Sequence, residues 1–157
     1  MNEVWRKQPY APYFETIEIM LRRIWCRETA SPNCQKSWTP ENPAYGQCAV
    51  TAASMYHGLG GPAVEGLRIM RAEVEGFGSH YWIRLPDGID VDLTACQFPE
   101  GTVIPEGEER TVEYLLDSER AKSARTRERM ELLDEIGETI VCETLEAMQR
   151  LGLDTET

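Results

Sequence analysis

The chain has 157 residues and a formal net charge of −11, because 27 acidic residues outnumber 16 basic ones. This length is typical of one domain, and a hydrophobic content of 41% is sufficient for a packed core. The excess of negative charge excludes sequence-independent binding of nucleic acid and disfavours binding to an anionic membrane, since both depend on Lys and Arg.

The chain is predicted to begin with an arm and an amphipathic helix. Residues 1–12 contain aromatic residues and prolines without periodicity, so we interpret them as an N-terminal arm. From Phe14 to Trp25, apolar residues recur every three or four positions, which predicts a helix over residues 13–27 with one buried face. This helix is expected to cover part of the apolar surface of the core.

A long loop and a second helix are predicted next. Residues 28–46 are rich in Ser, Pro, Asn, Thr and Gly and exceed the usual length of a connection, which indicates a functional loop. Small apolar side chains follow from Cys48 to Tyr56, and a series of glycines begins at Gly58. Short side chains on all sides predict a tightly buried helix that ends at glycine.

An antiparallel sheet of three strands is predicted over residues 67–75, 79–85 and 89–94. In the last two strands apolar and polar residues alternate along the sequence. The Pro86-Asp87-Gly88 sequence between them is typical of a turn in which glycine adopts the left-handed conformation.

The register of this hairpin follows from its two faces. If residues 86–88 form the loop, Ile83 faces Val91 and one face of the hairpin becomes wholly apolar. A slip by one residue would bring charges onto that face, so the register is well specified. On the opposite face His80 and Asp92 then lie on a cross-strand diagonal, about 7–8 Å apart.

A loop followed by a long helix is predicted for the rest of the chain. Residues 97–110 contain Pro and Gly and are interpreted as a loop, while residues 111–116 carry no clear signal for helix or strand. Apolar residues from Leu132 to Met148 recur at helical spacing, which predicts a helix over residues 124–151 with a charged, solvated face.

These elements combine into one domain of the α+β class over residues 13–151, with residues 152–157 as a C-terminal tail. The longest apolar runs are only a few residues, so no segment is expected to span a bilayer. The basic residues near Met1 are not followed by an apolar segment, which argues against a secretory signal. We therefore expect a cytoplasmic protein.

Five cysteines are spread along the chain and never form a Cys-x-x-Cys pair. An odd number of dispersed cysteines in a cytoplasmic protein argues against a disulfide framework. Neither the cysteines nor the two histidines have the spacing of a zinc site, so we expect no metal and no cofactor. Most of the thiols are expected to be small buried apolar groups.

Cys48 differs from the other cysteines because it is predicted at the first turn of its helix, where the helix dipole and unpaired N–H groups favour the thiolate. With His80 and Asp92 it supplies what cysteine-dependent acyl transfer requires: a nucleophile, an imidazole that carries the proton, and a carboxylate that orients the imidazole. The expected oxyanion donors are the N–H of Cys48 and a side-chain amide of Asn42 or Gln47.

Each of these residues also has a structural interpretation. Cys48 by itself is more simply a buried core thiol, and His80 and Asp92 by themselves are a sheet histidine and a loop cap. Trp82 is expected beside the cleft as a substrate-binding residue, although an aromatic residue in the core is the commoner case. It is the combination of a helix-start Cys with a later His and Asp that favours catalysis.

Three segments contain the candidate residues: residues 38–52 contain Cys48, residues 78–88 contain His80, and residues 91–94 with 97–98 contain Asp92. These segments resemble the signature of the small bacterial YunG-type family, and the likeness extends over about residues 14–135. The chain departs from the family pattern at Ile83, where Asn is more usual, and its tail beyond about residue 137 is longer. The resemblance implies no established activity.

The order Cys, His, Asp is in turn similar to that of papain-like and transglutaminase-like enzymes, which implies a compact papain-like core. The expected function is a cysteine-dependent acyl hydrolase or acyltransferase of the amidase or peptidase type, acting on a peptide, amide or protein. The alternative is a non-catalytic module that binds a protein partner through the cleft, the acidic surface or the C-terminal helix. A third interpretation is a small-molecule-binding or metal-binding protein that uses the same cluster.

Overall fold

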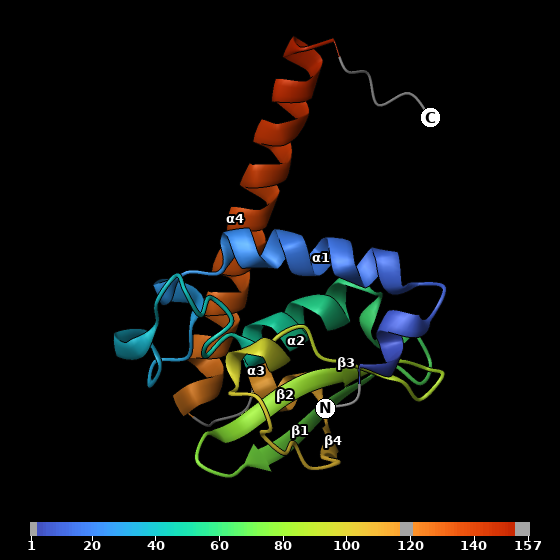
Figure 1. Ribbon diagram of the computed structural model, residues 1–157, viewed down its shortest axis with the longest axis vertical. Coiled ribbons are helices and arrows are strands. Elements are labelled where there is room, and N and C mark those ends of the chain that lie inside the picture. Colours follow the sequence, from blue (N-terminus) through green and yellow to red (C-terminus); the bar gives the residue numbers. More distant parts are fainter. Residues whose placement is uncertain (1–2, 117–120, 153–157) are drawn as a thin grey trace.

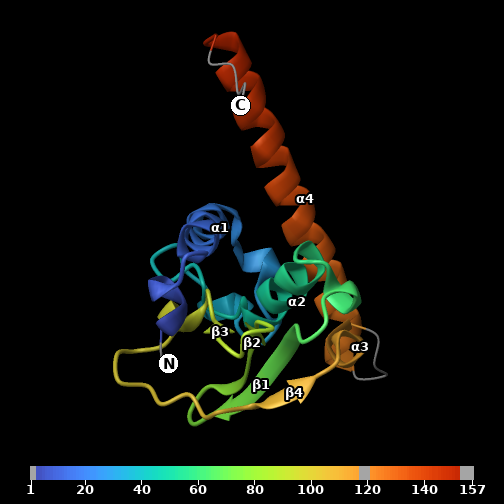
Figure 2. The same ribbon diagram turned by 90° about the vertical axis from the view of Figure 1, so that its right-hand side faces the viewer.

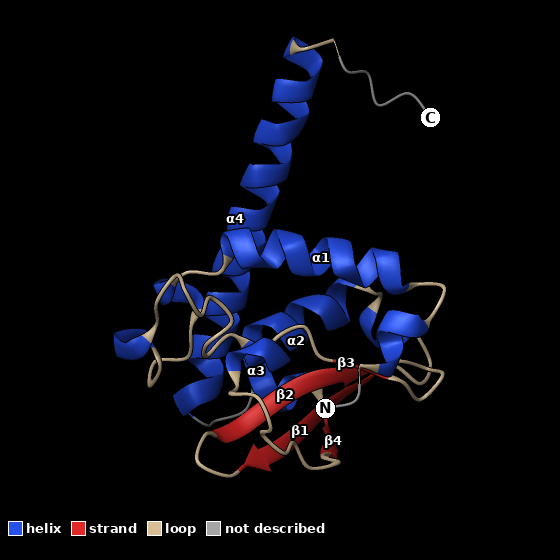
Figure 3. Cartoon of the chain, in the orientation of Figure 1, coloured by secondary structure: helices blue, strands red, loops and turns tan. Residues whose placement is uncertain are grey.

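The computed structural model describes residues 3–116 and 121–152, so most of the predicted C-terminal tail lies outside the described residues. A four-stranded antiparallel sheet forms one layer, and helices pack on it (Figure 1, Figure 3). The predicted α+β class is confirmed. The strands lie in the order β3-β2-β1-β4 and comprise β1 (Arg68–Val74), β2 (Gly78–Arg84), β3 (Asp90–Val91) and β4 (Glu108–Arg110).

The prediction of three strands is wrong, because β4 falls in the segment 97–110 that was interpreted as a loop. β4 pairs with β1 in an antiparallel register in which Ile69 lies opposite Arg110 and Arg71 lies opposite Glu108. Its sequence, Glu-Glu-Arg, has no alternation of apolar and polar residues. It joins the sheet through backbone hydrogen bonds to β1, which no local sequence pattern reveals.

The hairpin of β2 and β3 has the predicted register, since Ile83 pairs with Val91 and Arg84 pairs with Asp90. However, β3 contains only two residues, whereas a strand over residues 89–94 was predicted. The reason is a local turn: one carboxylate oxygen of Asp92 accepts hydrogen bonds from the N–H and the hydroxyl of Thr94, at 3.0 and 3.1 Å. Such side-chain bonds compete with the strand ladder and end it.

Helix α1 (Ala11–Ile24) begins two residues before its predicted start and ends three residues before its predicted end. Pro12 lies in the first turn, where the backbone N–H groups have no intrahelical acceptor, so its missing N–H costs no hydrogen bond of the helix. At the other end Trp25 takes an extended ψ of 132° and terminates the helix. Before α1, the single turn Val4–Lys7 buries Trp5 against Phe14.

The helix predicted from small residues is α2 (Cys48–Gly58), and it lies at the centre of the molecule between β2 and the long helix α4 (Ala121–Arg150) (Figure 2). Two hydrogen bonds tie α2 to its neighbours. The indole N–H of Trp25 donates to the hydroxyl of Thr51 at 3.0 Å, and Ser54 donates to Asp134 of α4 at 2.5 Å. These bonds hold α2 to Trp25 and to α4, and its packing against β2 places the start of the helix beside the sheet.

The predicted C-terminal helix is confirmed as α4, preceded by the short helix α3 (Val112–Leu116). The first half of α4 packs on the core through Met130 and Leu133, whereas its second half extends beyond the rest of the molecule (Figures 1 and 2). Within residues 3–116 and 121–152, no helix is long and apolar enough to cross a membrane.

Candidate functional site

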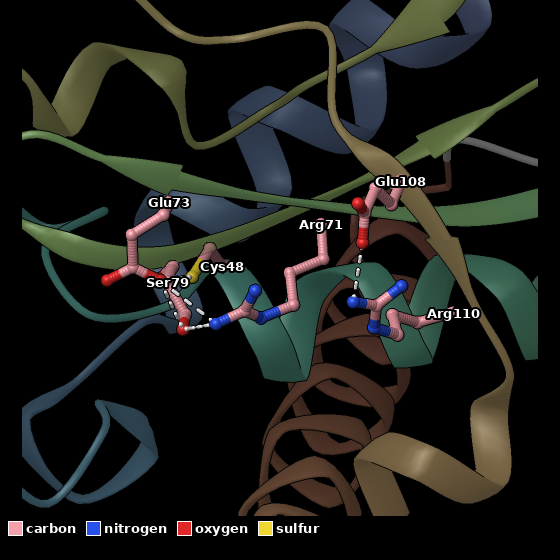
Figure 4. A network of polar contacts seen from close by, with 6 residues as sticks. All are labelled: Cys48, Arg71, Glu73, Ser79, Glu108 and Arg110. Atoms are coloured by element: carbon pink, nitrogen blue, oxygen red, sulfur yellow. Dashed lines mark hydrogen bonds and ion pairs between the residues drawn. The ribbon is translucent and has the colours of Figure 1, made fainter.

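Cys48 is the first residue of α2, as predicted, and its thiol is half-buried. The Sγ atom lies 3.9 Å from the backbone carbonyl oxygen of Ser79, at the start of β2 (Figure 4). The loop before α2 passes close to Cys34. Gly46 has a φ of +74°, and a Cβ there would lie 2.5 Å from the Cβ of Cys34, so only glycine fits.

The start of β2 beside Cys48 is anchored by side chains of the sheet. Arg71 donates a hydrogen bond of 2.6 Å to the hydroxyl of Ser79 and forms an ion pair of 2.9 Å with Glu73. Figure 4 shows these side chains meeting next to the sulfur of Cys48. Because Ser79 directly precedes His80, the same contacts limit the movement of the histidine backbone.

His80 and Asp92 meet in the structure, as the predicted diagonal requires. The Nε2 atom of His80 lies 2.5 Å from one carboxylate oxygen of Asp92, and the two residues are only 1% and 6% exposed. The other carboxylate oxygen is held by Thr94. Both oxygens of Asp92 are therefore occupied, and the carboxylate has a fixed orientation toward the imidazole.

The imidazole ring of His80 is enclosed by two aromatic rings. Trp82 stacks on one face with ring centroids 5.6 Å apart, and Phe98 makes an edge contact at 4.8 Å. Within the described chain, the second ring nitrogen, Nδ1, is buried and makes no hydrogen bond of standard geometry. With Nε2 engaged by Asp92, Nδ1 is the nitrogen that remains for proton transfer.

Interactions with Asp92 and Cys48 control the protonation of His80. Burial is the largest single influence and lowers the pKa, but the hydrogen bond to Asp92 and the interactions with Asp92 and Cys48 outweigh it and raise the pKa to about 10. The imidazole therefore carries a proton at neutral pH. Cys48 and Asp92 line the same small cavity, and Asp92 is bonded to His80, so the structure brings the three predicted residues into one region.

A groove of about 270 Å³ opens beside Cys48, and we call it the Cys48 groove. The predicted functional loop 28–46 contributes one wall, and the turn between β1 and β2 contributes another. Arg129 reaches the groove from α4. The lining residues used below are Cys34, Cys48, Phe77, Ser79, Phe98 and Arg129.

Three other predicted site residues, Asn42, Gln47 and Trp82, are not among the described residues that line this groove. The side-chain amide of Asn42 donates to the carbonyl of Gln97 at 3.1 Å. Gln47 is fully buried, and its amide donates to the carbonyl of Cys26 at 2.8 Å. Trp82 lies behind His80, in a small cluster with Met70 and Ala72.

Two residues at this site were not found from the sequence, namely Phe98 and Arg129. Phe98 lies in the segment 97–110, which was interpreted as a loop, and its contact with His80 depends on how that segment folds back. Arg129 is one of many charged residues in α4, and nothing in the helical pattern separates it from the solvated face. Only the tertiary structure shows that it is buried.

The described residues contain no group of three or more His, Cys, Asp and Glu side chains arranged to hold a metal ion.

The family profile described as YunG protein matches residues 13–138. The chain belongs to the YunG family. The resemblance noted from the three segments is confirmed, and the matched region contains Cys48, His80, Asp92 and Arg129. The second half of α4 lies outside the YunG match. No curated protein and no solved structure matches the chain significantly, and YunG membership by itself assigns no activity.

Proposed function

We propose that this YunG family member is a cysteine-dependent acyl hydrolase or acyltransferase with a papain-like arrangement. Cys48 is the nucleophile, His80 carries the proton and Asp92 orients the imidazole. The observation that supports this proposal best is the 2.5 Å hydrogen bond between the buried side chains of His80 and Asp92, of which Asp92 lines the same small cavity as Cys48.

In the proposed reaction the thiolate of Cys48 attacks the carbonyl carbon of an amide or ester and forms a tetrahedral intermediate. The first N–H groups of a helix have no intrahelical acceptor, so the N–H of Cys48 is available to the oxyanion. When the carbon–nitrogen or carbon–oxygen bond breaks, the leaving group takes a proton from Nδ1 of His80. Water then attacks the thioester and gives its proton to His80, and the carbon–sulfur bond breaks, which releases the acid and restores the thiolate–imidazolium pair. In a transferase an amine or alcohol replaces the water.

The surrounding residues have defined parts in this proposal. Asp92 holds Nε2, which turns Nδ1 toward the thiol. Trp82 and Phe98 exclude water from the His80–Asp92 hydrogen bond, which strengthens it. The amides of Asn42 and Gln47 already donate to backbone carbonyls, so the proposal assigns the oxyanion to the N–H of Cys48.

The first test is the reactivity of the thiol. In folded protein near neutral pH, iodoacetamide should label Cys48 well before Cys26, Cys34, Cys96 and Cys142, as measured by mass mapping. Cys142 is the informative control, because it is exposed on the projecting half of α4 and accessible without being activated. Labelling of Cys48 no faster than Cys142 would overturn the proposal and leave the non-catalytic binding module.

A second test looks for the acyl-enzyme. Incubation with p-nitrophenyl acetate should add one acetyl group to Cys48, and intact-protein mass spectrometry should show its loss with time by hydrolysis. The acetyl group should not form in the Cys48→Ala variant. An acetyl group found only on lysines or on another cysteine contradicts the assigned nucleophile.

A further inference from the structure

The charge of the Cys48 groove is opposite to the charge of the chain. Arg129 is the one charged side chain among the described lining residues, and no carboxylate lines the groove. The chain as a whole carries 27 acidic residues and a net charge of −11. A cleft whose described lining contains a guanidinium and no carboxylate favours an anion over a cation.

The guanidinium of Arg129 is only partly satisfied by the protein. The residue is 8% exposed, and it donates to the carbonyls of Arg125 and Thr29 and to the hydroxyl of Thr126, each at 3.1 Å. A guanidinium has five N–H groups, so these bonds to described residues use three of them. The remaining two belong to the two terminal nitrogens, which form the fork that binds carboxylates.

The charge of Arg129 has no acidic partner among residues 3–116 and 121–152. Arg84 shows the contrast, because its guanidinium makes two bonds to Asp90 at 2.6 and 3.0 Å. A buried charge without a counterion carries a large desolvation penalty. A penalty of this kind is offset when a ligand brings the counterion.

Arg129 also lies close to the proposed nucleophile. Burial lowers the pKa of Arg129, while Cys48 and Cys34 act in the opposite direction, which places the guanidinium within electrostatic reach of both thiols. Arg129 and Cys48 also line the same groove, so a group bound by the guanidinium lies in the groove that contains the thiol.

We infer that Arg129 is a specificity-determining residue that binds a carboxylate of the substrate. The substrates are then acyl compounds, such as peptides or amides, that carry a free carboxylate beside the bond attacked by Cys48. This inference rests on the proposed function, because it assumes that the thiol of Cys48 is the reacting group.

The experiment compares two alkylating reagents that differ only in charge, iodoacetate and iodoacetamide. The rate of each at Cys48 is measured by mass mapping near neutral pH, and the ratio of the two rates is the readout. Both reagents are attacked by the same thiolate, so the ratio is insensitive to the fraction of Cys48 that is ionised. The imidazolium of His80 attracts iodoacetate as well, and Arg129 is therefore tested by comparing variants that share His80.

In Arg129→Met the ratio of the iodoacetate rate to the iodoacetamide rate should fall about tenfold, the size expected for a hydrogen-bonded charge pair. In Arg129→Lys it should fall less, because the charge remains. The matched control is Arg125→Met, which removes an exposed arginine one turn earlier in α4 and should leave the ratio unchanged. If Arg129→Met does not fold, Arg129→Gln replaces it in the experiment. It is also neutral, and it keeps an amide that can donate to the Thr29 carbonyl.

An unchanged ratio in a folded neutral variant at position 129, or an equal fall in Arg125→Met, overturns the inference. If Cys48 still reacts faster than the other cysteines in that case, the proposed function stands without it. If Cys48 is unreactive toward both reagents in the wild type, the proposed function itself fails.

Discussion

The two ring nitrogens of His80 have different environments, and this difference decides what the residue can do. Nε2 is bound to Asp92, whose second oxygen is held in turn by Thr94. Nδ1 makes no standard hydrogen bond to any residue that the structure describes, and it is the nitrogen left for the thiol of Cys48. A histidine in a purely structural role would be expected to have both nitrogens satisfied, since buried polar groups are normally paired.

Substitution of His80 should affect the thiol more than substitution of Asp92. In His80→Ala the imidazole is lost, and the pH profile of Cys48 alkylation should move to higher pH because the thiolate has lost its cationic partner. Asp92→Asn removes the orienting charge but leaves the imidazole, so a smaller shift is expected with the fold preserved. Alkylation rates of Cys48 across pH test this, and identical profiles in the wild type and both variants would show that neither residue is coupled to the thiol.

The contact between Trp82 and His80 can be tested through a glycine. Gly107 has a φ of +82°, and a Cβ there would lie 2.5 Å from the Trp82 ring and 2.9 Å from the carbonyl oxygen of Arg71. Gly107→Ala should therefore displace Trp82 from His80, lower the denaturant midpoint and slow the alkylation of Cys48.

Gly101→Ala is the matched control for this substitution. Gly101 has a φ of +84°, so the backbone strain is similar, but a Cβ there meets nothing within 4 Å among the described residues. Gly101→Ala should therefore lower the free energy of unfolding only through backbone strain, by about 1–2 kcal/mol, and leave the alkylation rate of Cys48 unchanged. Equal effects of the two substitutions on the alkylation of Cys48 would show that the position of Trp82 does not matter to the site.

At the scale of elements, the site depends on where α2 and the β2–β3 hairpin meet. α2 supplies Cys48, and the hairpin supplies His80 and Asp92 from its two arms. The hairpin loop is closed by hydrogen bonds from Leu85 to Ile89 and from Gly88 to Leu85, each at 2.9 Å. The register of the loop therefore sets the position of Asp92 relative to His80.

Gly88 makes this register testable, since its φ is +84°. No atom lies within 4 Å of a Cβ built there, so the effect of a substitution comes from the backbone conformation. Gly88→Val should lower stability by at least about 1–2 kcal/mol, because left-handed geometry is unfavourable and worse for a β-branched residue. Gly88→Asn should be tolerated much better. Denaturant midpoints measure the difference, and equal midpoints for the Val and Asn variants would contradict the role of the turn.

At the scale of the whole molecule, the buried His80–Asp92 pair links folding to pH. The pKa of His80 is about 10 in the folded protein against an ordinary value of 6.5, so the folded state binds this proton more tightly. The corresponding stabilisation is complete below about pH 6.5 and is lost as the pH rises toward about 10. The denaturant midpoint should therefore fall over this range.

His80→Gln is the control for this pH dependence, because it removes the titrating group and keeps a polar side chain of similar size. Its denaturant midpoint should change less between pH 7 and pH 10 than that of the wild type. Parallel curves for the two proteins would mean that His80 has no raised pKa in the folded state.

Local patterns were sufficient for several parts of the fold and the site. The alternation around Pro86-Asp87-Gly88 predicted the register of the hairpin and hence the meeting of His80 with Asp92, because a strand has a period of two and a slip by one residue exposes the wrong face. The change to small residues after Gly46 predicted a helix starting at Cys48. Both signals come from neighbouring residues, whose spacing is visible in the sequence.

Contacts between distant segments were decided only by the tertiary structure. β4 is a strand because it lies beside the free edge of β1, although its own three residues are polar and charged. Asn42 and Gln47 are suitable oxyanion donors by residue type, but the fold directs both amides to backbone carbonyls. Arg129 looks like any other charged residue of α4 until the helix packs against the loop that contains Thr29. Periodicity determines which face of an element is buried, whereas the partner that buries it, and the polar groups this brings together, depend on packing across the whole chain.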